Sequence, residues 1–264
     1  MSTYVLVHGA WHGAWCWERA VPLLEPHGHS VVAPDLPGMG DDRTRLADVT
    51  LEMWGQFVAE LVQRQDEPVI LVGHSRGGIV VSQAAEYVPD RIRTLVYLAA
   101  FLVPNGRTLH ETMRRIPPRP ESKDSMVFSP DQTTSTIAPD AVRRVFYNTT
   151  PDEWAARVAA LSGPEPMVSF TTPLQVTDER YGSVDRVYIE CTQDRAIAPQ
   201  LQRMMEADMP CREVITMDTD HSRFYSAPEL LAAHLMQVAG SRPAVGRARA
   251  SEGGDRADKE EGVA

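Results

Sequence analysis

The chain has 264 residues, a formal net charge of −10 and a pI near 5.3, so electrostatic attraction to nucleic acid or to an anionic membrane is disfavoured. The length suits one large domain with an insertion rather than two independent domains. No apolar run could span a bilayer, and the first strand is predicted to begin by Tyr4, which leaves no room for a signal peptide. We therefore expect a cytoplasmic protein.

Three cysteines, Cys16, Cys191 and Cys211, are widely spaced along the chain. Their number is odd, which argues against a disulfide framework, and no two of them have the spacing of metal ligands. We expect reduced, mostly buried thiols and no bound metal.

The first hundred residues alternate between short apolar runs and amphipathic stretches. Strands are predicted at residues 4–7, 31–33, 69–72 and 92–99, and helices at 15–27, 50–62 and 76–89. Pro22 is expected to kink the first of these helices or to lie in its first turn. This alternation favours an α/β fold with a mostly parallel sheet and helices on both faces.

The alternation stops after the fourth strand. Between residues 104 and 182 no clear strand pattern is found, and the helical candidates lie at 140–147 and 152–161. An insertion beside the functional edge of a sheet is typical of a helical cap or lid. Apolar side chains such as Val145 and Phe170 favour this interpretation of 104–182 over a disordered excursion.

The alternating pattern returns after the insertion. Strands are predicted at 185–191 and 213–217, and helices at 200–207 and 228–238. Residues 1–103 and 183–240 are therefore predicted to form the core domain. From 241 to 264 bulky apolar residues almost disappear among Arg, Ala, Gly, Glu and Asp, which predicts a disordered tail.

The segment Gly73-His74-Ser75-Arg76-Gly77 connects a buried strand to a helix. A strand that turns into a helix within two residues forces the turn residue into a strained conformation, and glycines two positions to either side remove Cβ atoms that would collide. Ser75 is thereby placed at the C-terminal edge of the sheet, above a helix N-terminus. The pattern alone is weak, but this strand and helix are the context that a nucleophile elbow requires.

A serine nucleophile needs a base, and the base needs an orienting acid. Of the histidines that follow Ser75, His221 comes after a predicted strand and a turn, so it lies on a loop at the edge where a base is needed. His110 opens the insertion, and His234 lies in the apolar register of the last helix. We predict His221 as the base.

The acid is predicted to be Asp194, which follows a predicted strand and precedes His221 by 27 residues. This placement agrees with the chain order serine, acid, histidine that accompanies a nucleophile elbow. Asp218 and Asp220 are too close to His221 in sequence to face its ring, and Asp220 is expected to pin the loop instead.

The backbone N–H groups of Ala10 and Arg76 are predicted to form an oxyanion hole. Ala10 follows the first strand and faces the elbow, while Arg76 begins a helix, where the N–H is unpaired and the dipole favours negative charge. Candidates for the substrate pocket are ring-bearing side chains of the first loop and of the insertion: Trp11, His12, Phe128, Phe146 and Trp154.

With these residues in place, the chain resembles the α/β-hydrolase fold and, more narrowly, its plant methylesterase and hydroxynitrile lyase branch. The resemblance covers about residues 3–239, and its most specific parts are Val5 to Trp15, Gly28-His29, Val69 to Gly78, Tyr97 to Leu102, Thr177 to Asp194, Gln202 and Asp220-His221. It implies a cofactor-free enzyme with a helical cap over a buried, mostly apolar pocket. The implied partner is a small-molecule substrate, namely a methyl ester of a hormone-like or aromatic acid.

Two positions separate the activities of this branch. The cyanide-releasing lyases carry threonine after the strand-end histidine and lysine after the catalytic histidine, where this chain has Gly9 and Ser222. Because no lysine is present to stabilise a leaving cyanide, the resemblance favours hydrolysis of a carboxylic ester, such as a secondary-metabolite ester, through an acyl-enzyme. A non-hydrolytic lyase and a small-molecule receptor stay open as alternatives, as does homodimer formation.

Arg76 departs from the plant enzymes, which commonly have leucine at this position. Its side chain either places a charge near the pocket mouth or lies exposed on the flank of its helix. We favour the exposed position, because arginine is common on amphipathic helices. The segment 107–135 also matches the plant proteins poorly, so the resemblance leaves the substrate undetermined.

Overall fold

The computed structural model describes residues 1–241, and its core is one parallel sheet. The strands are β1 (Thr3–Val7), β2 (Ser30–Val32), β3 (Val69–His74), β4 (Ile92–Leu98), β8 (Arg186–Cys191) and β9 (Glu213–Met217), in the order β2-β1-β3-β4-β8-β9. All neighbouring strands are parallel, which places their C-terminal ends at one edge. The disordered tail predicted for 241–264 lies, from residue 242 onward, outside the described residues.

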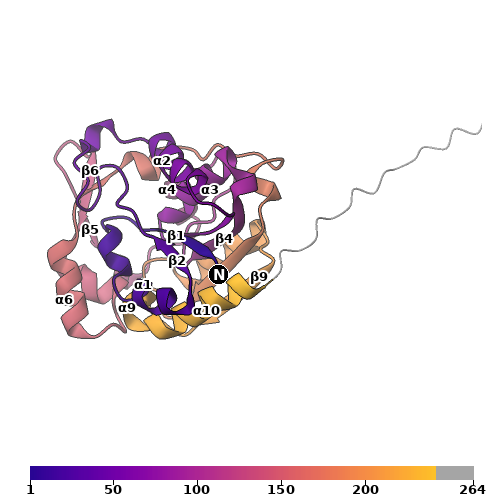
Figure 1. Cartoon of the computed structure of the whole chain (residues 1–264). Coiled ribbons are helices and arrows are strands. Elements are labelled where there is room, and N and C mark those ends of the chain that lie inside the picture. The colour runs from indigo at the N-terminus through magenta and orange to yellow at the C-terminus, as the bar shows by residue number, and fades with distance from the viewer. Residues whose placement is uncertain (242–264) are drawn as a thin grey trace, which may run out of the picture.

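Helices cover both faces of this sheet, as the sequence predicted. The α-helices of residues 1–241 are α1 (Val21–Leu24), α2 (Leu51–Gln63), α3 (Gly77–Tyr87), α4 (Leu109–Met113), α5 (Pro139–Ala141), α6 (Asp152–Leu161), α7 (Val168–Thr171), α8 (Pro199–Asp208), α9 (Arg223–Ser226) and α10 (Pro228–Gly240), and α4 to α7 belong to the insertion. Figure 1 shows α2 and α3 on one side of the strands and α1 with α10 on the other. The α/β architecture is thereby confirmed.

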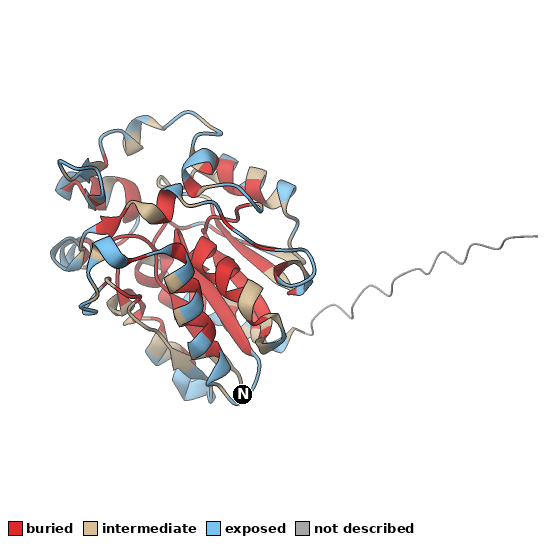
Figure 2. Ribbon diagram, turned by 90° about the horizontal axis from the view of Figure 1, so that it is seen from above, coloured by how far each residue is buried: buried red, intermediate tan, exposed pale blue. Residues whose placement is uncertain are grey.

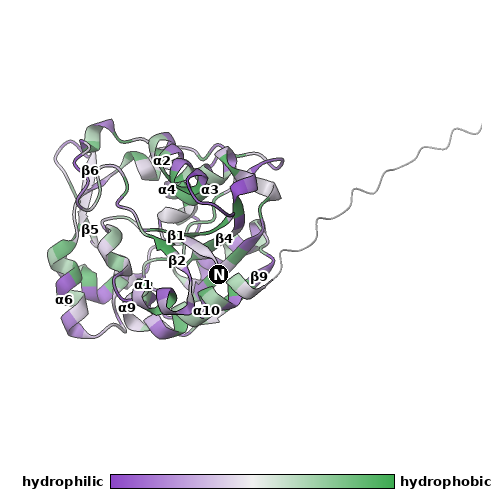
Figure 3. Ribbon diagram, viewed as in Figure 1, coloured by the Kyte–Doolittle hydropathy of each residue, from purple (hydrophilic) through white to green (hydrophobic). Residues whose placement is uncertain are grey.

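The core forms because the central strands are apolar on both faces. All six residues of β3 are buried, and β1 is buried from Tyr4 onward. Figure 2 shows buried strands between helices that keep exposed outer faces, and Figure 3 shows the same contrast in hydropathy. Helix α2 begins where the Thr50 hydroxyl accepts a hydrogen bond from the Met53 N–H, and it buries Trp54 toward the core.

The helix predicted at 15–27 is broken in the structure. It divides into a 3₁₀ turn at Ala14–Trp17, helix α1 and a second 3₁₀ turn at Glu25–His27. Pro22 lies in the first turn of α1, which is one of the two expected outcomes, because a proline in that turn loses no helical hydrogen bond.

The insertion between β4 and β8 contains strands that the sequence did not predict. β5 (Met126–Phe128), β6 (Thr134–Ile137) and β7 (Glu165–Pro166) form a small antiparallel sheet, so the expectation of an insertion without strands is wrong. Strands of two to four residues are too short to show a periodic pattern. The hairpin turn is held locally, since the Asp131 carboxylate accepts hydrogen bonds from the Ser129 hydroxyl and the Thr133 N–H.

Helix α6 coincides with the candidate at 152–161. The candidate at 140–147 is only partly regular, because α5 has three residues and continues as a π turn over Val142–Phe146.

The three cysteines are free, and Cys16 and Cys191 are buried. Across residues 1–241, no helix is long and apolar enough to cross a membrane.

Candidate active site

The C-terminal ends of three parallel strands bring the predicted triad residues to one edge of the sheet, with β4 between the first strand and the other two. Ser75 follows β3, Asp194 follows β8 and His221 follows β9. The three side chains are buried, with Ser75 the most accessible at 8%. Residues far apart in the chain therefore share one location because of the strand order.

The turn at Ser75 has the strained geometry expected of an elbow. Its φ angle is +54°, in the left-handed region that non-glycine residues rarely adopt. A Cβ atom on Gly73 would lie 2.7 Å from the Gly77 carbonyl oxygen, and one on Gly77 would lie 2.8 Å from the His8 carbonyl oxygen. The two glycines therefore permit the strand, the helix and the first loop to approach this closely.

His221 and Asp194 form a buried hydrogen-bonded pair. The distance from His221 Nδ1 to Asp194 Oδ2 is 2.8 Å. The other carboxylate oxygen, Oδ1, accepts the N–H groups of Ala196 and Ile197, both at 2.8 Å, and Gln202 Nε2 donates to Oδ2 at 3.2 Å. Because the carboxylate is held as an acceptor, Nδ1 carries the ring proton and Nε2 is left as a base.

A second histidine fixes the backbone of His221. The carbonyl oxygen of His221 accepts hydrogen bonds from His74 Nε2 at 3.1 Å and from Arg223 Nη2 at 2.9 Å. Burial lowers the pKa of His74 well below its usual value, and the positive charge of Arg223 acts in the same direction. His74 therefore stays neutral, and its rotation is restrained by the bond that it donates.

The peptide groups around Ala10 are also held by neutral histidines. His8 Nδ1 bonds to the Gly9 carbonyl oxygen at 2.8 Å while its Nε2 accepts the Leu36 N–H, and His12 Nδ1 bonds to the Ala10 carbonyl oxygen at 2.6 Å. Burial lowers the pKa of His12 to about 4 and that of His8 well below its usual value. The carbonyl groups on either side of the Ala10 N–H are thereby tied to the protein.

The two predicted oxyanion donors, Ala10 and Arg76, line the same cavity as Ser75. Within residues 1–241, neither N–H donates a backbone or side-chain hydrogen bond. Both amides are therefore free to bind an oxygen atom placed beside the Ser75 hydroxyl.

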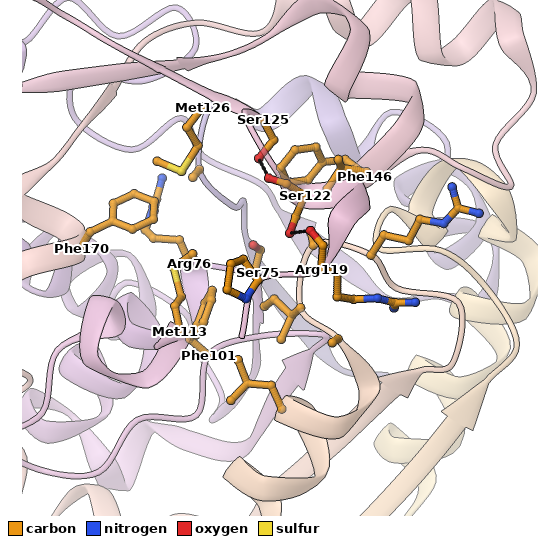
Figure 4. Close-up of a pocket in the computed structure, with 18 of the residues that line it drawn as sticks. Ser75, Arg76, Phe101, Met113, Arg119, Ser122, Ser125, Met126, Phe146 and Phe170 are labelled. Atoms are coloured by element: carbon orange, nitrogen blue, oxygen red, sulfur yellow. Dashed lines mark hydrogen bonds between the residues drawn. The ribbon is translucent and has the colours of Figure 1, made fainter. Parts of the chain in front are cut away.

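The cavity above Ser75 has a volume of about 430 Å³, a typical size for a small-molecule site. It is mostly apolar, and Figure 4 shows Phe101, Met113, Phe146 and Phe170 around Ser75. Of the predicted pocket residues, Trp11, Phe128 and Phe146 line it.

The other two predicted pocket residues do not line this cavity. His12 is turned beneath the loop, where its Nε2 bonds to the Tyr147 hydroxyl at 2.5 Å. Trp154 packs against Tyr225, with ring centroids 5.4 Å apart, under the guanidinium of Arg19. Both pocket assignments are wrong, because these rings serve the internal packing of the loop and of the cap.

The alternative acids take structural positions. Asp220 accepts hydrogen bonds from the Thr149 N–H and the Thr150 hydroxyl at 2.9 Å, which ties the loop before His221 to the insertion. Asp218 is exposed and bonds to the Thr192 hydroxyl. His110 lines the cavity, and His234 lies on α10.

The exposed position favoured for the Arg76 side chain is wrong. The side chain is 1% exposed and forms an ion pair with Glu165 of β7, with an Nε to Oε1 distance of 2.8 Å. Glu165 was not among the residues predicted for the site. A buried arginine needs an acidic partner, but no local sequence pattern indicates which of the many acidic residues forms that ion pair.

Gly9 is a position where the structure predicts a loss of activity. An alanine Cβ there would lie 2.9 Å from both Ser75 Cβ and His74 Nδ1. We expect Gly9→Ala to lower kcat about 100-fold through displacement of Ser75, the predicted nucleophile. Steady-state ester hydrolysis measures this loss, with circular dichroism as the check on folding. Gly240→Ala is the control, because its added methyl would meet no atom within 4 Å. A wild-type kcat in Gly9→Ala would contradict the expected displacement of Ser75.

Comparisons with known proteins show the family to which this chain belongs. The chain belongs to the alpha/beta hydrolase family, whose model matches residues 4–234. It is 35% identical to salicylic acid-binding protein 2 of Nicotiana tabacum, covering 89% of this chain and 96% of that protein. It is 33% identical to methylesterase 7 of Arabidopsis thaliana, covering 89% of this chain and 95% of that protein.

A solved structure extends the similarity to a bacterial enzyme. The pyrethroid hydrolase of Sphingobium faniae JZ-2 superposes with a TM-score of 0.81 at 29% identity, covering 90% of this chain and 97% of that one. The chain is therefore an esterase-like hydrolase of the methylesterase branch.

Proposed function

We propose that this protein hydrolyses a methyl or aryl ester of a small, largely apolar acid through an acyl-enzyme on Ser75. The observation that carries the proposal is the position of Ser75, on a strained turn that opens into an apolar cavity of about 430 Å³, at the same sheet edge as the His221–Asp194 pair. Names of similar proteins, methylesterase and pyrethroid hydrolase, support the ester class.

In the proposed mechanism, Ser75 Oγ attacks the ester carbonyl carbon while His221 Nε2 takes the hydroxyl proton. The carbonyl oxygen becomes an oxyanion that the N–H groups of Ala10 and Arg76 stabilise. The tetrahedral intermediate collapses, the C–O bond to the alcohol breaks, and His221 returns the proton to the leaving alcohol. Water, deprotonated by His221, then releases the acid and restores Ser75.

The acidic net charge of −10 supports a small molecule as the partner in place of nucleic acid or a membrane. A cytoplasmic location and homodimer formation stay predictions from the sequence.

The test is a panel of p-nitrophenyl and methyl aryl esters hydrolysed in ¹⁸O-labelled water, with the Ser75→Ala variant as the blank. We expect rapid release of p-nitrophenol followed by a slower steady state, one ¹⁸O atom in the product acid, and labelling of Ser75 by a fluorophosphonate. Product without ¹⁸O would support a lyase. Tight binding of the panel with turnover below about one per minute, far under the usual enzymatic range, would support a receptor.

A further inference from the structure

The Arg76–Glu165 ion pair joins the elbow to the cap inside the protein. Arg76 Nε lies 2.8 Å from Glu165 Oε1 and Nη2 lies 3.2 Å from Oε2, so the contact is bidentate. The side chains are 1% and 0% exposed. Charged groups this deeply buried are stable only when further hydrogen bonds satisfy them.

The ion pair forms these further hydrogen bonds with the first loop and with the cap. Glu165 Oε2 accepts the N–H of Trp11 at 3.1 Å, and Arg76 Nη2 donates to the Gly9 carbonyl oxygen at 3.1 Å. Ser169 donates to Glu165 Oε1 at 3.0 Å, which holds the carboxylate from within the cap. The ion pair therefore contacts the residues immediately before and after Ala10.

Peptide geometry turns these contacts into control of the Ala10 N–H. The carbonyl of Gly9 and the N–H of Ala10 belong to one planar trans peptide group, so they point in opposite directions. A donor that holds the Gly9 oxygen thereby aims the Ala10 N–H away from itself. The bond from Trp11 N–H to Glu165 fixes the next peptide plane, at a residue whose φ angle of +62° is unfavourable without such support.

We propose that Arg76 and Glu165 are positioning residues that hold the two oxyanion donors in register. The inference rests on the proposed function, because it assigns work to the oxyanion hole of that reaction. The Arg76 backbone supplies one donor, its side chain orients the peptide of the other, and Glu165 couples both to strand β7 of the cap (Figure 4 shows Arg76 next to Ser75). Glu165 neutralises the guanidinium and the Trp54 ring lies 4.2 Å from it, while Nη1 forms no hydrogen bond with the residues that the structure describes.

The test compares kcat with ground-state binding in Glu165→Gln. The amide cannot accept from Trp11 and pair with Arg76 as the carboxylate does. We expect kcat for a p-nitrophenyl ester to fall about 10- to 100-fold, less than for complete loss of one oxyanion donor. Binding of the ether isostere of that ester should change less than about threefold, because the ether has no carbonyl oxygen for the oxyanion hole to hold.

A matched control is another ion pair between the cap and the core. Arg157 of α6 binds Glu18 in a bidentate contact of 2.8 and 2.7 Å, but on the surface and away from the first loop. We expect Arg157→Met to leave kcat within about twofold of wild type, since such exposed pairs contribute little.

A second variant that folds is needed, because removing one partner of the ion pair leaves the other charge buried and unpaired, which destabilises the protein. Arg76→Met combined with Glu165→Leu removes both charges and keeps apolar volume, and it should fold by circular dichroism yet show the same loss of kcat. Wild-type kcat in this double variant overturns the inference, because a purely structural pair would alter only the melting temperature. If Ser75→Ala is inactive while the pair variants keep full kcat, only the inference fails. If Ser75→Ala keeps full activity, the proposed function itself fails.

Discussion

Asp194→Asn is expected to lower kcat about 10⁴-fold while the fold is retained. The two N–H groups of Ala196 and Ile197 point at Oδ1, so the asparagine oxygen must take that position. Its NH₂ group then faces His221 Nδ1. That nitrogen must act as an acceptor, the ring proton moves to Nε2, and in the proposed triad the base can no longer take the proton of Ser75.

The two backbone N–H donors prevent the asparagine amide from turning around, because its NH₂ group would then face both of them. Gln202 Nε2 loses its acceptor at the Oδ2 position and keeps its bond to the Ile197 carbonyl oxygen at 2.7 Å. Asp218→Asn is the control, since this exposed carboxylate on the loop after β9 bonds to Thr192 and Gln193 and should tolerate the change. The measurement is the steady-state kcat for one aryl ester. A kcat of Asp194→Asn within tenfold of the wild-type value would mean that another acid orients His221.

Mild acid is expected to destabilise the protein steeply, because three buried histidines must stay neutral. Burial is the largest cause that lowers the pKa of His8, His12 and His74, to about 4 for His12 and well below the usual 6.5 for the other two. Above pH 6.5 neither the folded nor the unfolded state binds these protons. Below pH 6.5 the unfolded chain binds three protons on these histidines, while the folded protein binds none. The stability that the neutral histidines contribute is therefore present above pH 6.5 and is lost as the pH falls.

The expected slope approaches about 1.4 kcal/mol per pH unit for each histidine, or about 4 kcal/mol per pH unit for the three together. The free energy of unfolding in urea, measured between pH 7 and pH 5, gives this slope in a range where most carboxylates do not yet titrate. A His12→Gln variant, although less stable at neutral pH, should lose about one third of the slope. Equal free energies of unfolding at pH 7 and pH 5 would contradict the assignment of these histidines as neutral.

Local patterns were enough to predict the elbow and the pairing of Asp194 with His221. The strained turn at Ser75 is encoded within five residues, because flanking glycines are needed wherever a strand becomes a helix so abruptly. Asp194 and His221 each follow a strand, and parallel strands end at a common edge. Regular αβ alternation therefore predicted the meeting of residues that are 27 positions apart.

Tertiary structure alone decided what surrounds these groups. Arg76 and Glu165 are 89 residues apart, and only the folding of the cap over the first loop turns an apparent surface arginine into a buried partner. Similarly, His12 and Trp154 carry rings suited to a pocket, yet packing turned both away from it. The sequence by itself determined the fold class and the reactive groups, because they depend on local backbone geometry and strand order. The shape and electrostatics of the site depend on long-range contacts that no local pattern specifies.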